Sequence, residues 1–403
     1  MNAIITDPQK IDEVLSRGTI VEVLPSLDEF KKVLQSGKKL KFYIGFDATA
    51  PTLHLSHAKN FILLEKFRKL GHEVIVLFGD FTARIGDPTG ESSARKQLTR
   101  EDVLENVRRW KELIRPLMNF DDPNNSPVVK YNHDWLSKLT FEDVIGLASH
   151  LTVQQMLERD MFQKRLSENK PIHLHEFFYP LMQGYDSVAM DVDVELCGTD
   201  QIFNALVGRT LQRKINNKDK FVVAVTLMAD PKTGELMSKS KGTGVFLHVS
   251  AKEMYGQVMS QTDEMLELLF VNNTFLSLAE IKEIMSAQNP RDAKMKLALE
   301  ICRIFYGEAA AQEAEHNFVE VFQKKLNPEV IREVRVSESP VHIFDLLVTA
   351  GLTISKSEAR RVVTQKGVKI DGQVIDTEQE ITIPSEGILV QKGKREFVRV
   401  LPG

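Results

Sequence analysis

The sequence predicts an α/β protein that begins with an open parallel sheet and continues into an all-helical region and a small α+β module. Three observations support this division. Strand-like, helix-like and again strand-like runs follow one another between residues 41 and 81. The pattern from about 250 to 325 is helical throughout. After Pro340, short helices and short strands alternate up to the last residues.

The first region contains a β-α-β unit. "KFYIGFDA" (41–48) is typical of a buried strand, "LSHAKNFILLEKFRKLG" (55–71) of an amphipathic helix that ends at Gly71, and "EVIVLFGDF" (73–81) of the next strand. This order predicts two adjacent parallel strands joined by a crossover helix. A later strand is predicted at 220–230. Sheets of this kind bind ligands at the carboxyl ends of their strands.

The segments around this unit differ in pattern. Residues 92–180 are predicted to be largely helical, with "DDPNNSP" (121–127) as a loop. Residues 326–340 mix proline, serine and charge without a sustained period, which predicts a linker.

The C-terminal module carries clear helix and turn signals. The first predicted helix, which begins after Pro340, ends at Gly351. Ser355 and Glu358 predict a capping box at the start of the second helix. Asp371-Gly372 predicts the turn of a hairpin.

Composition excludes several classes of protein. The 403 residues are 42% hydrophobic and 27% charged with a net charge of −4, so nucleic-acid contact requires a local basic patch. Two cysteines without a CxxC pair argue against a disulfide framework or a cysteine zinc site and favour a reducing compartment. No signal-peptide pattern and no run long enough to span a bilayer is present. We therefore expect a cytoplasmic protein without a membrane segment.

Two histidines lie across the start of the first predicted helix. His54 and His57 in "HLSH" stand three residues apart, directly after a strand. Free N–H groups and the helix dipole favour an anion there. A metal pair needs further ligands, which the neighbouring residues do not offer, and ordinary satisfied histidines are the default for an isolated pair.

A second anion signal is "GELMSKSKGTGVF" (234–246), which is rich in glycine, serine and lysine. Such a loop suits a phosphate chain, because lysine supplies a point charge and glycine lets the backbone approach. An exposed basic turn is the alternative. The segment is not a Walker A motif, which argues against a P-loop NTPase.

Polar residues that suit a small ligand occur in three further places. Tyr179, Gln183 and Asp186 form a polar stripe at helical spacing among apolar neighbours, where either a ligand or solvent satisfies them. "ELCGTDQIFN" (195–204) offers a glycine, a carboxylate and an amide suited to a ribose. Asp87 lies in a Gly-Asp-Pro turn after a predicted strand.

Taken in order, these motifs resemble those of class I aminoacyl-tRNA synthetases, and among them the bacterial-type tyrosyl-tRNA synthetases. "HLSH" is similar to the HIGH motif and "LMSKS" to the KMSKS loop. "YIGFDATAP", "IGDPTG", "YPLMQGYDS" and "GTDQ" resemble blocks of the tyrosyl enzymes at matching order and spacing. The final module resembles an S4-type RNA-binding domain.

The resemblance implies a domain order. Residues 1–235 would form a Rossmann-type catalytic domain with a helical insertion at about 92–180. Residues 236–325 would hold the KMSKS-like loop and an α-helical anticodon-arm domain. After the linker at 326–340, residues 341–403 would form the S4-like domain.

The resemblance also implies a reaction. L-tyrosine would attack the α-phosphate of ATP, giving tyrosyl-adenylate and pyrophosphate, and the tyrosyl group would pass to the 3′ end of tRNA(Tyr). Mg²⁺ is expected to accompany ATP. No tightly bound cofactor and no resident metal are expected. A homodimer is implied.

The matching positions imply site residues in four groups. The catalytic group is His54, His57, Lys239 and Ser240. The tyrosine-binding group is Tyr43, Thr82, Asp87, Tyr179, Gln183, Asp186 and Gln201, with Tyr43 and Asp186 on the phenol hydroxyl. The ATP-binding group is Gly45, Asp47, His54, His57, Gly198, Asp200, Met237 and Lys239. The RNA-binding group is Lys356, Arg360, Arg361 and Lys366 in the S4-like domain.

Three positions depart from the family pattern: Ser56 replaces a glycine, Leu236 the first lysine of KMSKS, and Glu91 a lysine that many relatives carry. Arg95 offers a compensating charge. Three other functions are alternatives: a tryptophanyl-type synthetase, an RNA-binding protein on a degenerate synthetase scaffold, and a small-molecule nucleotidyltransferase.

Overall fold

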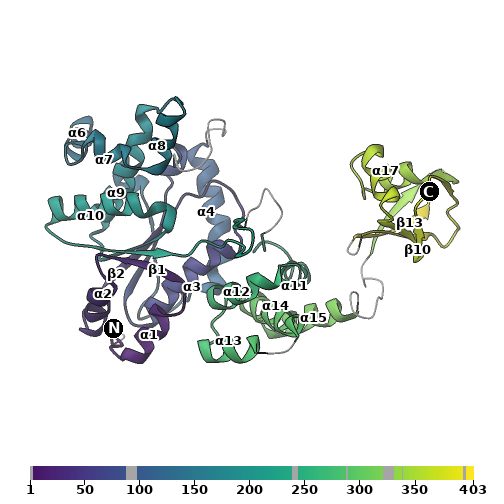
Figure 1. The fold of residues 1–403 in the computed structure, drawn as a ribbon, viewed down its shortest axis with the longest axis horizontal. Helices are drawn as coiled ribbons and strands as arrows, with labels where there is room; N and C mark the ends of the chain where they lie inside the picture. Colours follow the sequence, from purple (N-terminus) through teal and green to yellow (C-terminus); the bar gives the residue numbers. More distant parts are fainter. Residues whose placement is uncertain are drawn as a thin grey trace. The chain divides into compact units, whose positions relative to one another are not determined.

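The computed structural model describes residues 3–87, 98–237, 244–286, 289–320, 331–337, 339–393 and 396–403. The chain divides into two compact units, Met1–Ala311 and Gln312–Gly403. In Figure 1 the colours run from purple to green through the first unit and on to yellow in the second. None of the helices in these ranges is long and apolar enough to cross a bilayer.

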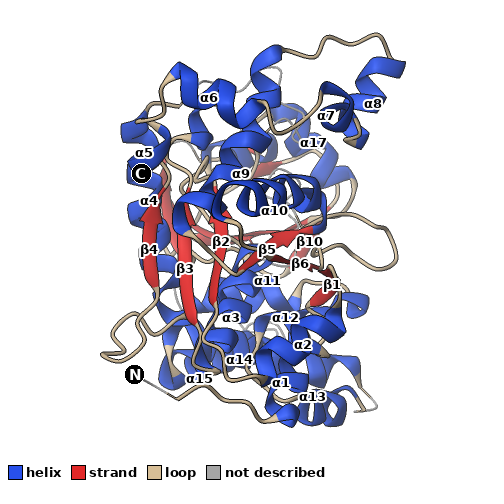
Figure 2. Ribbon diagram, turned by 90° about the vertical axis from the view of Figure 1, so that its left-hand side faces the viewer, coloured by secondary structure: helices blue, strands red, loops and turns tan. Residues whose placement is uncertain are grey.

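The first unit is built on a sheet of six described strands in the order β1-β6-β5-β2-β3-β4. Figure 2 shows β2, β3 and β4 side by side. All neighbours are parallel except β1 and β6. The strands are β1 (Ile20–Leu24), β2 (Lys41–Phe46), β3 (Glu73–Phe78), β4 (Val128–Tyr131), β5 (Val194–Gly198) and β6 (Phe221–Val225). The strand order changes direction between β2 and β5, where open sheets of this type bind ligands.

The predicted β-α-β unit is confirmed. Helix α3 (Leu55–Lys69) joins β2 to β3, which pair in parallel. The prediction that this helix is amphipathic was wrong, because it is buried on most of its sides, with Lys59 and Glu65 among the buried residues. The rings of Phe42 and Phe67 stack 4.3 Å apart. Gly71 follows the C-terminal end of this helix, and its φ of +98° is a backbone conformation that other residues rarely adopt.

Three strands of this sheet were not predicted, so the prediction of the sheet was incomplete. Strand β1 lies at one edge, and its Val21 and Glu22 side chains are exposed, so it has little apolar pattern. Strand β5 lies between β2 and the predicted late strand β6. Its sequence VELCG contains a glutamate, which hid an apolar run that is otherwise buried. Strand β4 lies inside the segment 92–180, which was predicted to be largely helical. It has four residues on the edge of the sheet and is only partly buried, so it has no strong apolar pattern.

Most other residues of the first unit are helical. The helices that precede β5 along the chain, besides α3, are α1 (Pro8–Leu15), α2 (Leu27–Gln35), α4 (Arg100–Ile114), α5 (His133–Leu136), α6 (Phe141–Ala148), α7 (Val153–Leu157), α8 (Asp160–Ser167) and α9 (Phe178–Met190). Helix α10 (Ile202–Asn216) lies alongside α9 in both views and contacts β5 and β6. The short helical turns are η1 (Thr82–Arg84), η2 (Arg115–Leu117), η3 (Leu174–Phe177), η4 (Thr199–Gln201) and η5 (Asp263–Met265).

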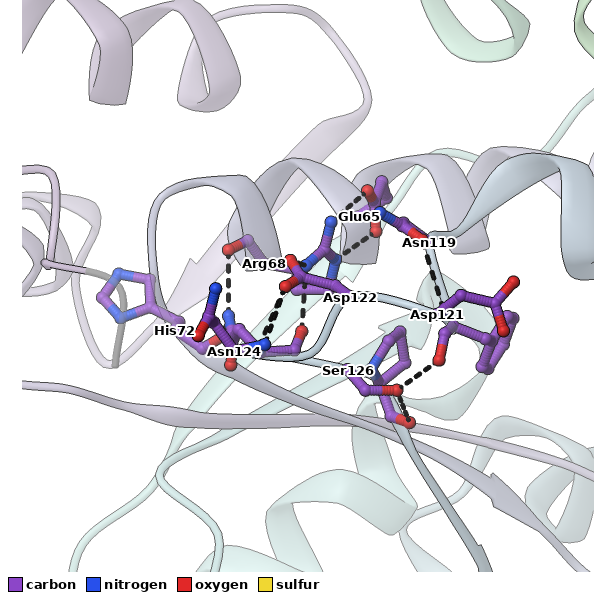
Figure 3. Close-up of polar contacts among 11 residues, drawn as sticks. Glu65, Arg68, His72, Asn119, Asp121, Asp122, Asn124 and Ser126 are labelled. Carbon is purple, nitrogen blue, oxygen red and sulfur yellow. Dashed lines mark hydrogen bonds and ion pairs between the residues drawn. The ribbon is translucent and has the colours of Figure 1, made fainter.

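The predicted loop at 121–127 is confirmed, and Figure 3 shows how it is fixed to α3. The Arg68 guanidinium donates to Glu65 at 2.6 and 2.8 Å, to Asp122 at 2.6 Å and to the Asn125 carbonyl at 2.9 Å. A cavity of about 480 Å³ opens beside this loop, and none of the predicted site residues lines it. The hydrogen bonds of Arg68 therefore stabilise the packing of this loop on α3, away from the predicted site residues.

The helical prediction for 250–325 is confirmed wherever the structure describes this region. The helices are α11 (Ala251–Met259), α12 (Leu266–Asn273), α13 (Leu278–Met285), α14 (Pro290–Tyr306) and α15 (Glu308–Phe318). Helix α14 packs against α11, α12 and α13. Several of these helices begin with the N-cap that the sequence supplies; for example, the Ser250 hydroxyl accepts from the Glu253 N–H at the start of α11.

The second unit contains a sheet of five described strands in the order β10-β9-β12-β13-β7. These are β7 (Arg332–Val336), β9 (Val368–Ile370), β10 (Gln373–Ile375), β12 (Ile388–Lys392) and β13 (Glu396–Pro402). Two helices, α16 (Ile343–Thr349) and α17 (Lys356–Thr364), complete the core, and β8 (Val341–His342) pairs with β11 (Glu380–Ile381).

The predicted linker 326–340 was wrong for β7, which pairs in parallel with β13. This strand is at the edge of the sheet, and most of its side chains are exposed, so its sequence carries little apolar signal. The predicted boundary at 341 therefore falls inside the folded module.

The local signals of this module are largely confirmed. Gly351 follows α16 with a φ of +64°, and Asp371-Gly372 turns the hairpin with φ values of 48° and 84°. Only half of the predicted capping box forms. The Ser355 hydroxyl accepts from the Glu358 N–H, whereas the Glu358 carboxylate accepts from the Ile354 N–H instead of that of Ser355.

Candidate active site

The predicted site residues gather where β2 and β5 end. Gly45 is exposed near the carboxyl end of β2, and Gly198 ends β5 next to it in the sheet order. A Cβ atom on Gly198 would lie 2.4 Å from an oxygen of Asp200, so only glycine leaves that carboxylate in place. These residues therefore lie at the carboxyl ends of parallel strands, where the sequence predicted that a ligand would bind.

The HLSH residues form the start of α3. His54 is the N-cap residue, and its N–H donates to Nδ1 of His57 at 3.4 Å. Burial lowers the pKa of His54 to about 4 and that of His57, which also feels the charge of His54, to about 3. Both rings are thus neutral near pH 7. Among the described residues, none pairs with the buried Nδ1 of His54, which leaves a polar atom for a ligand.

The residues on either side of the SKSKGT segment contact the HLSH motif. The Leu55 N–H donates to the Val245 carbonyl at 3.0 Å, and a Cβ on Gly244 would touch both His54 and Met237. Met237 is buried, while Leu236 is half exposed. Lys239 and Ser240 lie outside the described residues, as do Glu91 and Arg95. The two segments that were predicted to bind an anion thus contact each other through the described residues Gly244 and Val245.

Asp47 joins two of the predicted tyrosine-binding residues. Its carboxylate accepts from the Thr82 hydroxyl at 2.7 Å and from the Tyr179 hydroxyl at 2.8 Å. Burial, with a smaller contribution from the charge of Asp87, raises the pKa of Asp47 to about 6, although both hydroxyl bonds oppose this rise. Burial also raises the pKa of Tyr179 well above its usual value.

Amide side chains join the other predicted residues. Gln201 donates to Asp87 at 2.5 Å and to Asp200 at 3.1 Å. Asn204 donates at 2.9 Å to both Gln183 and Gln201. This chain of hydrogen bonds brings the predicted residues of α9 and η4 together with Asp87.

The two residues predicted to bind a phenol hydroxyl have separate partners. The Tyr43 hydroxyl lies 2.9 Å from the Ser187 hydroxyl. Asp186 accepts from Trp135 at 2.7 Å and from Asn132 at 3.3 Å. Burial raises the pKa of Tyr43 and that of Asp186 well above their usual values. The predicted polar stripe of α9 is therefore directed inward, and Asp186 is only 3% exposed.

Sequence reasoning missed the residues that support this cluster. They are Asn132, Trp135, Arg159, Ser187, Glu195, Asn204 and Lys220. Arg159 lies 3.5 Å from Asp87 and is 4% exposed. A usable signal existed for Glu195 and Lys220, because a charged residue in or beside an apolar strand requires a buried partner. The others have no signal before the fold is known.

The predicted RNA-binding residues have acidic neighbours. Lys356 lies 2.5 Å from Asp345, Lys366 lies 3.5 Å from Asp376, and Arg360 lies 3.8 Å from Glu378. The fourth residue, Arg361, is exposed on α17. Three of the four basic side chains thus lie close to carboxylates, which reduces the local positive charge.

Two family models match this chain. Residues 35–323 match the family described as tRNA synthetases class I (W and Y), and residues 324–400 match a tyrosine--tRNA ligase SYY-like C-terminal domain. The tyrosine--tRNA ligase of Moorella thermoacetica is 44% identical over 96% of this chain and 94% of its own length. That of Haemophilus influenzae is 42% identical over 98% of both.

Solved structures show the same fold. A C-terminally truncated mitochondrial tyrosyl-tRNA synthetase of Aspergillus nidulans matches 78% of this chain and 94% of its own, with 24% identity and a TM-score of 0.65. The tyrosyl-tRNA synthetase of Archaeoglobus fulgidus, solved with L-tyrosine, matches 77% and 100% with 18% identity and a TM-score of 0.58. The extent of the sequence matches leaves one assignment: this chain belongs to the class I tRNA synthetases of the tryptophanyl and tyrosyl family.

Proposed function

We propose that this protein is the ATP-dependent ligase that activates L-tyrosine as tyrosyl-adenylate and transfers it to tRNA(Tyr). Near-full-length relatives that are tyrosine--tRNA ligases support this assignment over the tryptophanyl alternative. One structural observation carries the chemistry: the HLSH motif and the buried polar cluster of β2, α9 and η4 lie at the same edge of the parallel sheet.

The activation step requires positioning and charge stabilisation. The tyrosine carboxylate is already a nucleophile at pH 7, so it needs no protein base to attack the α-phosphate of ATP. The α-phosphate–oxygen bond to pyrophosphate breaks as the acyl–phosphate bond forms. We assign His54 and His57, as neutral donors, to the phosphate oxygens, and Lys239 and Ser240 to the leaving pyrophosphate.

The nucleotide would lie along the ends of β2 and β5. Gly45, Gly198 and Met237 would contact the nucleotide, with Asp47 and Asp200 near the ammonium and ribose ends. The buried Nδ1 of His54, which has no hydrogen-bond partner in the part of the chain that the structure describes, fits this role, because it offers a polar atom to the ligand. ATP is the substrate of this family, and we propose that Mg²⁺ enters bound to it, in the cytoplasm, where ATP and tRNA are both available.

The tyrosine would lie between the two hydrogen-bonded groups. We assign its phenol hydroxyl to Tyr43 and Asp186. Its ammonium group would lie near Asp87, Tyr179 and Gln183. Thr82 would line the pocket, and Gln201 would lie near the carboxylate. The bonds from Thr82 and Tyr179 to Asp47 and from Gln201 to Asp87 hold these polar groups ready for such a ligand.

A comparison of the intact chain with a chain ending at residue 323 tests the two halves of the reaction. We expect tyrosine-dependent pyrophosphate exchange to be retained by the shorter chain, because the residues assigned to activation lie before 311. We expect tRNA charging to fall if Lys356, Arg360, Arg361 and Lys366 bind RNA. Exchange with tryptophan but not with tyrosine would contradict the assignment. Equal charging by both chains would exclude the C-terminal unit from the reaction.

We further propose that the chain acts as a homodimer through α6, α7 and α8. Large apolar side chains are exposed on these helices: Phe141 is 78%, Val153 65%, Ile145 55% and Leu166 48% exposed. Exposed apolar side chains in such numbers are typical of an interface. Analytical ultracentrifugation of Phe141→Glu should show a shift toward monomer, with Leu236→Glu, at an exposed apolar position elsewhere, as the control.

A further inference from the structure

A completely buried ion pair lies behind the proposed tyrosine site. Lys220 and Glu195 are 0% and 2% exposed and contact each other directly. Glu195 belongs to β5, and Lys220 immediately precedes β6, its parallel neighbour. Burying two charges is costly, and apolar residues of similar volume often serve stability as well or better. The position of the pair therefore suggests a role other than stability.

Hydrogen bonds connect this pair to both ends of the proposed tyrosine site. Lys220 Nζ donates to Ser187 Oγ at 2.7 Å, and Ser187 lies 2.9 Å from the Tyr43 hydroxyl. Ser187 also lies 3.3 Å from Oε2 of Glu195. The other oxygen, Oε1, accepts from Gln183 at 3.1 Å. One carboxylate thus holds Gln183 with one oxygen and the Ser187–Tyr43 pair with the other.

The chemistry of these groups sets the direction of their protons. Lys220 can only donate, so the Ser187 oxygen accepts from it. Glu195 as a carboxylate can only accept, and a bond to a charged acceptor is the stronger one, so the Ser187 proton points to Glu195. The Tyr43 proton then points into the network, to the remaining lone pair of Ser187 or to the Glu195 carboxylate, with which Tyr43 also interacts. The Tyr43 oxygen is left with lone pairs for a hydroxyl that donates to it.

We propose that Ser187, Glu195 and Lys220 are positioning residues for substrate selection, which hold the Tyr43 hydroxyl as an acceptor for the phenol of tyrosine. The inference rests on the role proposed above for Tyr43. Phenylalanine has no hydroxyl to donate, so it would leave the oriented Tyr43 oxygen unpaired. The network acts through Tyr43 and Gln183 and does not itself touch the substrate.

The helix that covers the network leaves room for it. A Cβ atom on Gly208 of α10 would lie 2.7 Å from Lys220 Nζ and 3.0 Å from Ser187 Oγ. Gly208→Ala therefore disturbs the network from outside without removing any of its polar groups. Gly256→Ala on α11, where a Cβ meets nothing within 4 Å, is the matched control.

The test is a double-mutant cycle in pyrophosphate exchange, with tyrosine and phenylalanine as the two amino acids. We expect Ser187→Ala to lower the tyrosine-to-phenylalanine ratio of kcat/KM about tenfold, the usual value of one buried hydrogen bond to a reading group. The KM for tyrosine should rise while the KM for ATP is unchanged. In a Tyr43→Phe background, Ser187→Ala should have little further effect on the ratio.

Two further variants keep the test independent of folding defects. Glu195→Gln with Lys220→Met removes both charges while keeping similar volumes, and it should lower the same ratio, as should Gly208→Ala. If Ser187→Ala lowers the ratio equally with and without the Tyr43 hydroxyl, its role is only structural and the inference is overturned. If Tyr43→Phe itself leaves the ratio unchanged, the proposed role of Tyr43 fails and the network has no target.

Discussion

Gly79→Ala should disable tyrosine activation. Gly79 follows β3, and its N–H donates to the Phe46 carbonyl at 2.9 Å, so its backbone is held in place. A Cβ atom there would lie 2.0 Å from Oδ1 of Asp47 and 2.2 Å from Oγ1 of Thr82. Both side chains would have to move to accommodate one methyl group.

The size of the effect follows from these distances. Carbon and oxygen atoms that are not bonded stay at least about 3 Å apart, so the Asp47 and Thr82 oxygens must each shift by roughly 1 Å. A displacement of that size at a reacting site lowers the rate by about a hundredfold. This corresponds to about 2.7 kcal/mol of lost transition-state stabilisation. The Thr82–Asp47 hydrogen bond of 2.7 Å should be lost with it.

The assay is tyrosine-dependent pyrophosphate exchange, with thermal unfolding as a check that the variant folds. Gly256→Ala is the control, because its new methyl group meets open space on a helix. The control should keep full activity and gain up to about 1 kcal/mol of stability. A folded Gly79→Ala protein with activity within about threefold of the parent would refute the roles given to Asp47 and Thr82.

Three other outcomes are expected. Lys220→Met should lower the free energy of unfolding by about 3–5 kcal/mol in urea titrations, because it leaves Glu195 buried without its opposite charge. An equal loss in the Glu195→Gln, Lys220→Met double variant would contradict this explanation. The folded-state pKa values of His54 and His57, about 4 and about 3, lie below the unfolded value. The stability of the protein should therefore be full above about pH 6.5 and fall as the pH drops below it. His57→Gln should flatten this pH dependence, and an unchanged slope would argue against burial as its cause. Both Gly387 and Gly393 have positive φ values, but only at Gly387 would a Cβ lie 2.6 Å from a backbone oxygen. Calorimetry should therefore show that Gly393→Ala lowers the free energy of unfolding by about 1 kcal/mol and that Gly387→Ala lowers it by more. Equal losses would show that the close contact relaxes.

Strong local patterns were enough to predict much of the fold. The β-α-β unit has continuous apolar strands and a long helix, so its elements and their parallel pairing were predictable. Strands β1, β4, β5 and β7 were not, because β1, β4 and β7 lie on sheet edges and β5 contains Glu195. A strand that relies on its neighbours for burial shows little of this in its own residues.

Those site residues that lie within recognisable sequence motifs could be predicted. Residues from four distant segments, such as Asp47, Thr82, Tyr179 and Gln201, do meet at one edge of the sheet. Supporting residues were missed because single positions gave no pattern. Trp135 holds Asp186 from a part of the chain that was predicted only as helical, and this contact exists only in three dimensions.

The pairing of β7 with β13 has a mechanical consequence for the module it belongs to. Strand β7 has its ladder partner on one side only, and that partner is the seven-residue strand β13. If β13 were loosened, the five residues of β7 would be released and would add up to about 16 Å to the reach of the segment that carries the module. The hydrogen bonds between two segments far apart in sequence thus decide whether these five residues belong to the folded module or to the chain that precedes it.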